Sequence, residues 1–181
     1  GTSDLQAPSV PTVLFVPSLV NRAYILDLSE RRSLVRYFSS CGFRPLLLDW
    51  GAPGATERQF ALSDYIDGRL NRGLDRALEL AEGPVGMTGY CMGGDLILPL
   101  VQRRPEDVVA AAFLATPWDF HADRGLPEQM LPLIASLLSP ALEQMGELPV
   151  DCLQTFFASL NPNLAGSKFR RFRHMDQESA A

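Results

Sequence analysis

Four short apolar runs are spaced along the first two thirds of the chain, and each has the length and composition of a buried strand. The runs are Thr12–Val16, Pro45–Leu48, Val85–Thr88 and Val108–Ala115. They are bounded by residues that favour turns, and they carry few or no charges. Near-continuous apolar strands of this kind are typical of a parallel sheet that is covered on both faces.

Segments with helical periodicity separate these runs. Residues 34–38 place apolar side chains at helical spacing, and Gly42 is expected to end that helix. An apolar stripe over residues 66–81 follows Ser63, which we expect to cap a second helix. A third helix includes Leu96–Val101. Strands that alternate with helices through short connections predict an α/β fold: a parallel sheet of about four strands with helices on both faces.

The pattern changes after Thr116, where the strand signal ends. Three segments have the character of short helices: Leu126–Leu138, Ala141–Leu148 and Val150–Leu160. Prolines 127, 132, 140 and 149 are expected to break them. We therefore predict two parts of one domain, with the sheet portion in residues 1–120 and a helical cap segment with a basic and then polar tail in residues 121–181.

Composition narrows the functional classes. Apolar residues make up 46% of the 181 residues and the net charge is −5, so the chain can bury a core and is a poor candidate for non-specific nucleic-acid binding. The longest wholly apolar run, Val108–Ala115, is far too short to span a bilayer. The start of the chain carries no pattern of a secretory leader, and we expect a cytoplasmic protein without a transmembrane segment.

Cysteine and histidine usage gives no support for a metal site. The three cysteines form no C-x-x-C motif, and Cys41 and Cys152 are expected to be buried small hydrophobic residues. His121 and His174 are too far apart to form a helical metal-binding pair. We expect no metal.

Gly89-Tyr90-Cys91-Met92-Gly93 is the strongest chemical signal in the chain. This G-x-C-x-G motif lies between a predicted strand and a predicted helix, which is the context of a nucleophile elbow. The sharp turn holds the nucleophile clear of the sheet, and the flanking glycines allow backbone to pass where a Cβ would clash. The amides at the start of the following helix favour a thiolate and stabilise an oxyanion. The alternative is a structural cysteine beside chance glycines.

Other candidate residues have weaker signals. The loop Pro17–Arg22 follows the first strand, where such folds place a second oxyanion-hole amide, although an ordinary turn fits equally well. Asp49 and Asp119 follow strand ends and are more readily explained as turn or cap residues. Asp95 suits the helix dipole but puts a negative charge near a thiolate, and His121 is expected to be a solvated surface group.

Several motifs in one order resemble the polyhydroxyalkanoate (PHA) synthase family. They are the segment Val16–Leu28 after the first strand, the D-W-G-x-P stretch within Leu48–Pro53, Asp64-Tyr65-Ile66, the cysteine lipase box Gly89–Gly94 and the T-x-x-D-F stretch Thr116–Phe120. The likeness extends from about Val13 to Phe120 and, more loosely, to Phe172. It implies a partial α/β-hydrolase fold followed by a helical cap segment.

The resemblance also implies a chemistry. Members of this family are acyltransferases that polymerise (R)-3-hydroxyacyl-CoA into polyester in the cytoplasm, with no separate cofactor because coenzyme A is part of the substrate. Cys91 matches the nucleophile, and Met92 and Val20 match the backbone oxyanion donors. The resemblance further implies homodimers and association with polyester granules.

The chain departs from the family in its catalytic base. The family's histidine and aspartate lie beyond the cap and match no position here, so we expect a truncated or fragmentary form. His121, with Asp119 to orient it, is only a weak substitute. Two alternatives stay open: a hydrolase that acts on a small ester or thioester, and a non-catalytic fragment that binds granules or a partner.

Overall fold

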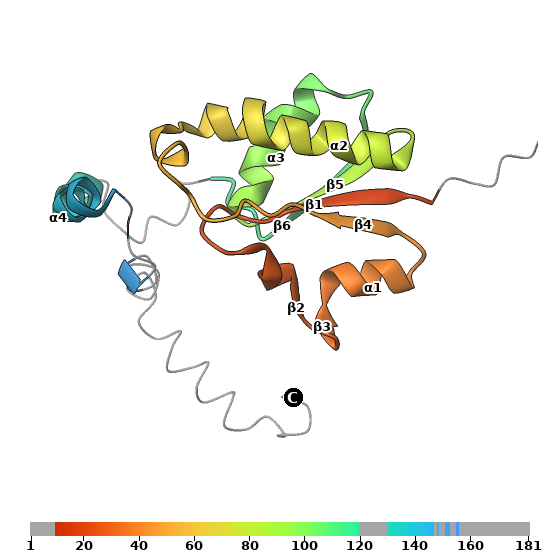
Figure 1. The fold of residues 1–181 in the computed structure, drawn as a ribbon, viewed down its shortest axis with the longest axis horizontal. Helices are drawn as coiled ribbons and strands as arrows, with labels where there is room; N and C mark the ends of the chain where they lie inside the picture. Colours follow the sequence, from red (N-terminus) through yellow and green to blue (C-terminus); the bar gives the residue numbers. More distant parts are fainter. Residues whose placement is uncertain (1–9, 120–129, 147, 149–150, 153–154, 156–181) are drawn as a thin grey trace, which may run out of the picture. The chain divides into compact units, whose positions relative to one another are not determined.

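The computed structural model describes residues 10–119, 130–146, 148, 151–152 and 155 (Figure 1). The chain forms two compact units, residues 1–119 and residues 120–181, and each is described by itself. The first unit contains the sheet and the whole predicted nucleophile motif.

A four-stranded sheet forms the centre of the first unit. Its strands are β1 (Thr12–Val16), β4 (Arg44–Leu47), β5 (Val85–Tyr90) and β6 (Val108–Leu114), in the order β4-β1-β5-β6. All three pairings are parallel, which confirms the predicted fold class. Val16 is opposite Gly89 and Tyr90 is opposite Leu114, so the carboxyl ends of β1, β5 and β6 meet at one edge.

Helices cover both faces of this sheet (Figure 1). One face is covered by α2 (Asn71–Ala81) and α3 (Met92–Arg103), and the other by α1 (Leu34–Ser40), η1 (Ala23–Leu26) and the small hairpin β2 (Asp27–Ser29) with β3 (Arg32–Ser33). The hairpin is a feature that the sequence did not predict.

Strand β1 supplies two separate cores because its side chains alternate between the faces. Leu14 and Val16 belong to the cluster packed under α2 and α3, whereas Val13 and Phe15 belong to the cluster under α1. The ring of Phe15 meets that of Phe38 edge-on, with 5.0 Å between their centroids. A strand buried on both faces explains why this run contains no polar alternation.

The helix over residues 63–81 differs from its prediction at the start. Ser63 has helical dihedral angles and makes no side-chain cap, so the prediction that it caps the helix is wrong. Instead the Asp64 carboxylate accepts a hydrogen bond from the Ala61 amide at 2.7 Å. The first part is a π-helix, η3 (Asp64–Leu70), preceded by the short η2 (Glu57–Gln59). Apolar periodicity cannot distinguish a π-helical turn from an α-helical one, because both bury one stripe.

In the second unit the described helix is α4 (Met130–Met145). It contains both Pro132, in its first turn, and Pro140, so the breaks predicted at these two prolines are wrong. Proline has helical φ and removes one backbone hydrogen bond, and here the helix continues through the residue. The third predicted helix, Val150–Leu160, lies almost wholly outside the described residues.

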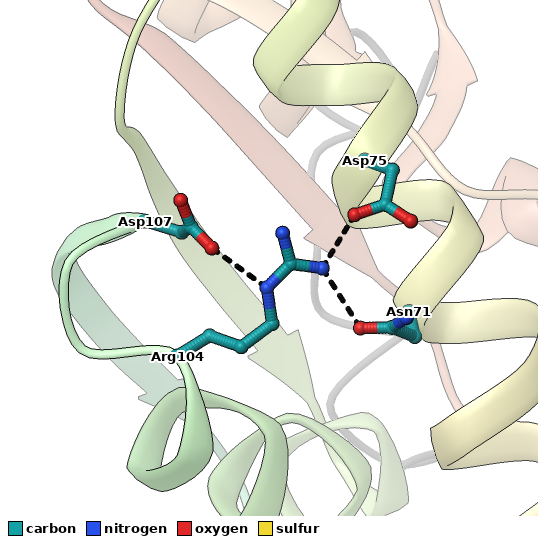
Figure 2. A network of polar contacts seen from close by, with 4 residues as sticks. All are labelled: Asn71, Asp75, Arg104 and Asp107. Atoms are coloured by element: carbon teal, nitrogen blue, oxygen red, sulfur yellow. Dashed lines mark hydrogen bonds and ion pairs between the residues drawn. The ribbon is translucent and has the colours of Figure 1, made fainter.

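A polar network joins the first half of α2 to the end of α3 and to the turn before β6 (Figure 2). The Arg104 guanidinium donates to the side chains of Asn71 at 2.8 Å and Asp107 at 2.7 Å, and it also pairs with Asp75. Its hydrogen bond to Asp75 is the largest cause that raises the pKa of Arg104 above its ordinary value. The network fixes the end of α3 that lies away from the nucleophile motif.

Candidate active site

Cys91 lies at the turn between β5 and α3, as the nucleophile-elbow motif predicts. Its backbone has φ 54° and ψ −130°, which is a conformation that a residue with a Cβ rarely adopts. A strained conformation of this kind costs about 1–3 kcal/mol and persists only where the surroundings enforce it. Two hydrogen bonds do so: the Cys91 amide donates to the Leu114 carbonyl at 2.8 Å, and the Gly94 amide donates to the Cys91 carbonyl at 2.9 Å.

The glycines around Cys91 are required by close backbone contacts. A Cβ on Gly93 would lie 2.2 Å from the carbonyl oxygen of Val16, and a Cβ on Gly89 would lie 2.5 Å from the Cα of Gly94. A Cβ on Gly94 would meet the Thr116 hydroxyl oxygen at 2.0 Å. The first turn of α3 therefore lies in direct backbone contact with the end of β1 and with the residues after β6. In this position the N-terminal amides of α3 point toward the turn that carries Cys91.

The loop after β1 is held by two polar contacts. Ser18 is fully buried, and its hydroxyl accepts a hydrogen bond from the Asn21 amide at 3.2 Å. The carbonyl of Pro17, also buried, accepts a hydrogen bond from the indole Nε1 of Trp50 at 2.9 Å. This loop contains Val20, whose side chain is 40% exposed.

One carboxyl group close to the turn, that of Asp95, has a pKa that differs from its ordinary value. Asp95 lies in the first turn of α3, and burial raises its pKa above the ordinary value. It also lines a mainly apolar pocket of about 400 Å³ together with Gly94, Leu98, Phe113, Thr116 and Trp118. This pocket lies beside β6, a strand whose second edge pairs with no other strand in the described part of the chain.

The structure brings some of the predicted residues together. Met92 is the first residue of α3 and directly follows Cys91, and Val20 lies in the loop after β1, whose last residue is opposite Gly89. Asp119 is exposed after β6, and both His121 and His174 lie outside the described residues. Asp49 accepts a hydrogen bond from the Gly51 amide at 2.9 Å, which is the turn role expected for it.

The predictions for the two other cysteines are wrong. Cys41 is exposed and Cys152 is only partly buried, whereas both were expected to be buried hydrophobic residues. Cys41 ends α1, a helix with no fully buried residue, so its position just before the turn leaves the thiol in solvent. Cys91 is also partly exposed, and it differs from both in its strained backbone.

Trp50 is part of the D-W-G-x-P stretch of the resemblance, but the sequence analysis predicted no role for it. Its contact with Pro17 joins residues that are 33 positions apart. The available signal was its place directly after the second predicted strand, since residues at the carboxyl ends of neighbouring parallel strands meet at the same edge.

Comparison with known families decides the fold assignment. Residues 11–179 match the family described as alpha/beta hydrolase fold. The chain belongs to the α/β-hydrolase fold family. The strand order, the helices on both faces and the strained residue between β5 and α3 agree with this membership.

The curated relatives of this α/β-hydrolase confirm the resemblance to PHA synthases. The poly(3-hydroxyalkanoate) polymerase subunit PhaC of Allochromatium vinosum is 34% identical over 91% of the chain, and that of Thiocystis violacea is 31% identical over 90%. The PhaC subunit of Haloarcula marismortui is 29% identical over 97% of the chain. The chain spans 46% of each of the first two proteins and 37% of the third, which is less than half of their length.

Solved structures support the α/β-hydrolase fold. A monoacylglycerol lipase from Paleococcus ferrophilus matches 72% of the chain and 48% of its own length, with a TM-score of 0.52 and 16% identity. An extracellular alpha/beta-hydrolase from a Paenibacillus species matches 72% of the chain and 52% of its own length, with a TM-score of 0.51 and 14% identity. Among the described residues, no helix has the length and apolar character needed to cross a membrane.

Proposed function

We propose that this chain is the nucleophile-bearing part of a PHA synthase, an acyltransferase that builds polyester from (R)-3-hydroxyacyl-CoA. The observation that carries the proposal is Cys91 at φ 54° between β5 and α3, in a chain whose relatives are named PhaC. A cysteine held in a strained turn at the start of a helix has the geometry of an acyl acceptor. The likeness to PhaC adds the substrate class.

In the proposed first step, the Cys91 thiolate attacks the thioester carbonyl of the substrate. The carbonyl oxygen becomes an oxyanion, which the backbone amides of Met92 and Val20 stabilise by hydrogen bonds. When the tetrahedral intermediate collapses, the carbon–sulfur bond to coenzyme A breaks, and coenzyme A leaves as a thiolate that takes up a proton. The products are an acyl-Cys91 thioester and free coenzyme A.

A cysteine nucleophile suits polymerisation better than a serine. Transfer from coenzyme A to Cys91 exchanges one thioester for another, so the acyl group stays activated for the next ester bond. An acyl-serine ester would lose that activation, which suits hydrolysis. In the second step the 3-hydroxyl of an incoming unit attacks the acyl-Cys91 carbonyl and must lose its proton.

That second step requires a general base, which typically contributes about 10²–10⁴ in rate. Asp119 is exposed after β6, and His121 follows it in the sequence. We propose that the pair is at most a weak substitute for the family's base, and that the first acyl transfer is the main reaction of these residues. Homodimers and binding to polyester granules are further proposals, based only on the likeness to PHA synthases.

The test is acylation of the chain by 3-hydroxybutyryl-CoA, followed by intact-mass and peptide mass spectrometry. We expect one hydroxybutyryl adduct on the Cys91 peptide, lost in Cys91→Ala and retained in Cys41→Ala, whose exposed thiol makes it the matched control. Free hydroxy acid without a retained adduct would favour the hydrolase alternative. No reaction of Cys91, together with granule binding that Cys91→Ala leaves unchanged, would favour the binding-only alternative.

A further inference from the structure

The indole of Trp50 connects the end of β4 to the loop that follows β1. Its Nε1 donates a 2.9 Å hydrogen bond to the carbonyl oxygen of Pro17. Pro17 is almost fully buried, so this oxygen has little access to water and depends on a donor from the protein. A backbone carbonyl at the root of the loop after β1 is thus held by a side chain from the segment that follows the neighbouring strand β4.

The same Pro17 carbonyl also lies against the first turn of α3. A Cβ on Gly93 would be 2.9 Å from this oxygen, so the backbone of Gly93 packs directly beside it. Gly93 follows Met92, the residue proposed to donate one oxyanion hydrogen bond. The Pro17 carbonyl is therefore a fixed point shared by the α3 turn and the loop after β1.

The residues that follow Pro17 in the loop are held by a second hydrogen bond. Buried Ser18 accepts a hydrogen bond from the Asn21 amide at 3.2 Å, which closes a turn around Val20. The Ser18 contact sets the shape of the turn. The Trp50 hydrogen bond ties the root of the turn to the segment after β4, and so it helps to set the direction in which the turn leaves the sheet.

The indole ring is itself held in place. It meets the ring of Tyr65 edge-on at a centroid distance of 5.7 Å, and Tyr65 meets Phe60 in the same way at 5.3 Å. Trp50 also packs against the core under α2 and α3. A donor fixed on several sides loses little entropy when it holds the loop, which is the condition for a preorganised site.

We propose that Trp50 is a positioning residue for acyl transfer: through the Pro17 carbonyl, it places the Val20 amide relative to Cys91. The proposal rests on the proposed function, because it assigns the Val20 amide to the oxyanion hole. Trp50 does not touch the reacting atoms. Its effect is confined to steps in which an oxyanion forms.

The test compares two reactions of Cys91 in Trp50→Phe, which keeps an aromatic ring and removes the N–H donor. Acylation by saturating 3-hydroxybutyryl-CoA should slow by roughly 10–100-fold, because misplacing one oxyanion donor costs about this much. Alkylation of the Cys91 peptide by iodoacetamide should keep its rate, because that substitution forms no oxyanion. Tyr37→Phe is the control, since this tyrosine is 64% exposed on α1, which covers the opposite face of the sheet from α3, and it should change neither rate.

Amide hydrogen exchange of Ser18–Asn21 provides a readout that is independent of activity. In Trp50→Phe it should accelerate by roughly fivefold or more, the factor for losing a hydrogen bond of ordinary net strength. Unchanged exchange, or unchanged acylation in a chain that acylates normally, overturns the proposal. If the wild-type chain takes up no acyl group, the proposed function fails, and the exchange result alone decides whether Trp50 holds the loop. If Trp50→Phe does not fold, Tyr65→Leu is measured in the same assays and should shift both in the same direction.

Discussion

A methyl group added at Gly93 tests whether the elbow depends on direct backbone packing. In Gly93→Ala the new Cβ would lie 2.2 Å from the carbonyl oxygen of Val16 and 2.9 Å from that of Pro17. Ordinary contact begins about 1 Å beyond the shorter distance, and the atoms in the way are backbone, not the end of a flexible side chain. Because Val16 is paired with Gly89 in the sheet, α3 must move instead.

That movement would loosen the packing of Leu96, Ile97 and Leu100, which are at most 1% exposed. Overpacking of a rigid core costs about 1–3 kcal/mol and sometimes more, so we expect Gly93→Ala to lower the free energy of unfolding by roughly 3 kcal/mol. Urea denaturation followed by circular dichroism measures the change. Gly83→Ala is the control, because no atom lies within 4 Å of its added Cβ. A Gly93→Ala midpoint equal to that of the wild type would refute the packing argument.

Three further predictions concern stability and turnover. Arg104→Met should lower the free energy of unfolding, measured by urea titration, by about 1–3 kcal/mol, because it leaves partly buried acceptors unpaired. The control Arg76→Met, at an exposed ion pair, should change this free energy by less than about 0.5 kcal/mol. Burial raises the folded-state pKa of Asp95, so the wild type loses stability as the pH rises through that pKa. Asp95→Asn should therefore raise the thermal unfolding temperature at neutral pH, and this increase should vanish in acid, where the wild-type carboxyl is protonated. CoA release from 3-hydroxybutyryl-CoA should stop after the first acyl transfer, and sustained release that is lost in both Cys91→Ala and His121→Ala would contradict this.

The parts of the fold that follow from local pattern were predictable from the sequence. Each strand of the sheet matches an apolar run to within two residues at either end. For β1, which is buried along its whole length, the reason is that a strand covered on both faces has no polar positions. The prediction that the run Val108–Ala115 is a buried strand is wrong in its burial: in β6 only Val108 is buried and residues 109–114 are exposed, because an apolar run indicates a strand but not how many neighbours cover it. The turn at Cys91 was also predictable, since Gly89, Gly93 and Gly94 are close in sequence and form a recognisable motif around the cysteine, although Gly93 and Gly94 make their close contacts with residues 16, 17 and 116. Ser63 was misassigned because a serine before an apolar stripe has the same appearance whether it caps the helix or lies inside it.

Contacts between distant residues left no comparable local signal. Trp50 contacts Pro17 across 33 positions, and Arg104 contacts Asp75 across 29. Neither residue type in isolation indicates such a partner, because tryptophan and arginine are common at both packed and solvated positions. These contacts depend on which strands are neighbours, and the order β4-β1-β5-β6 is a property of the folded chain.

The strained turn at Cys91 has an evolutionary consequence. Its geometry is enforced by Gly89, Gly93 and Gly94 and by backbone hydrogen bonds, and none of these contacts involves the sulfur atom. A single codon change from cysteine to serine would therefore keep the scaffold and replace only the atom at its tip. On the proposed function, the serine chain would then carry its acyl group as an oxygen ester in place of a thioester, so a single atom at this position would decide how much activation the acyl group keeps.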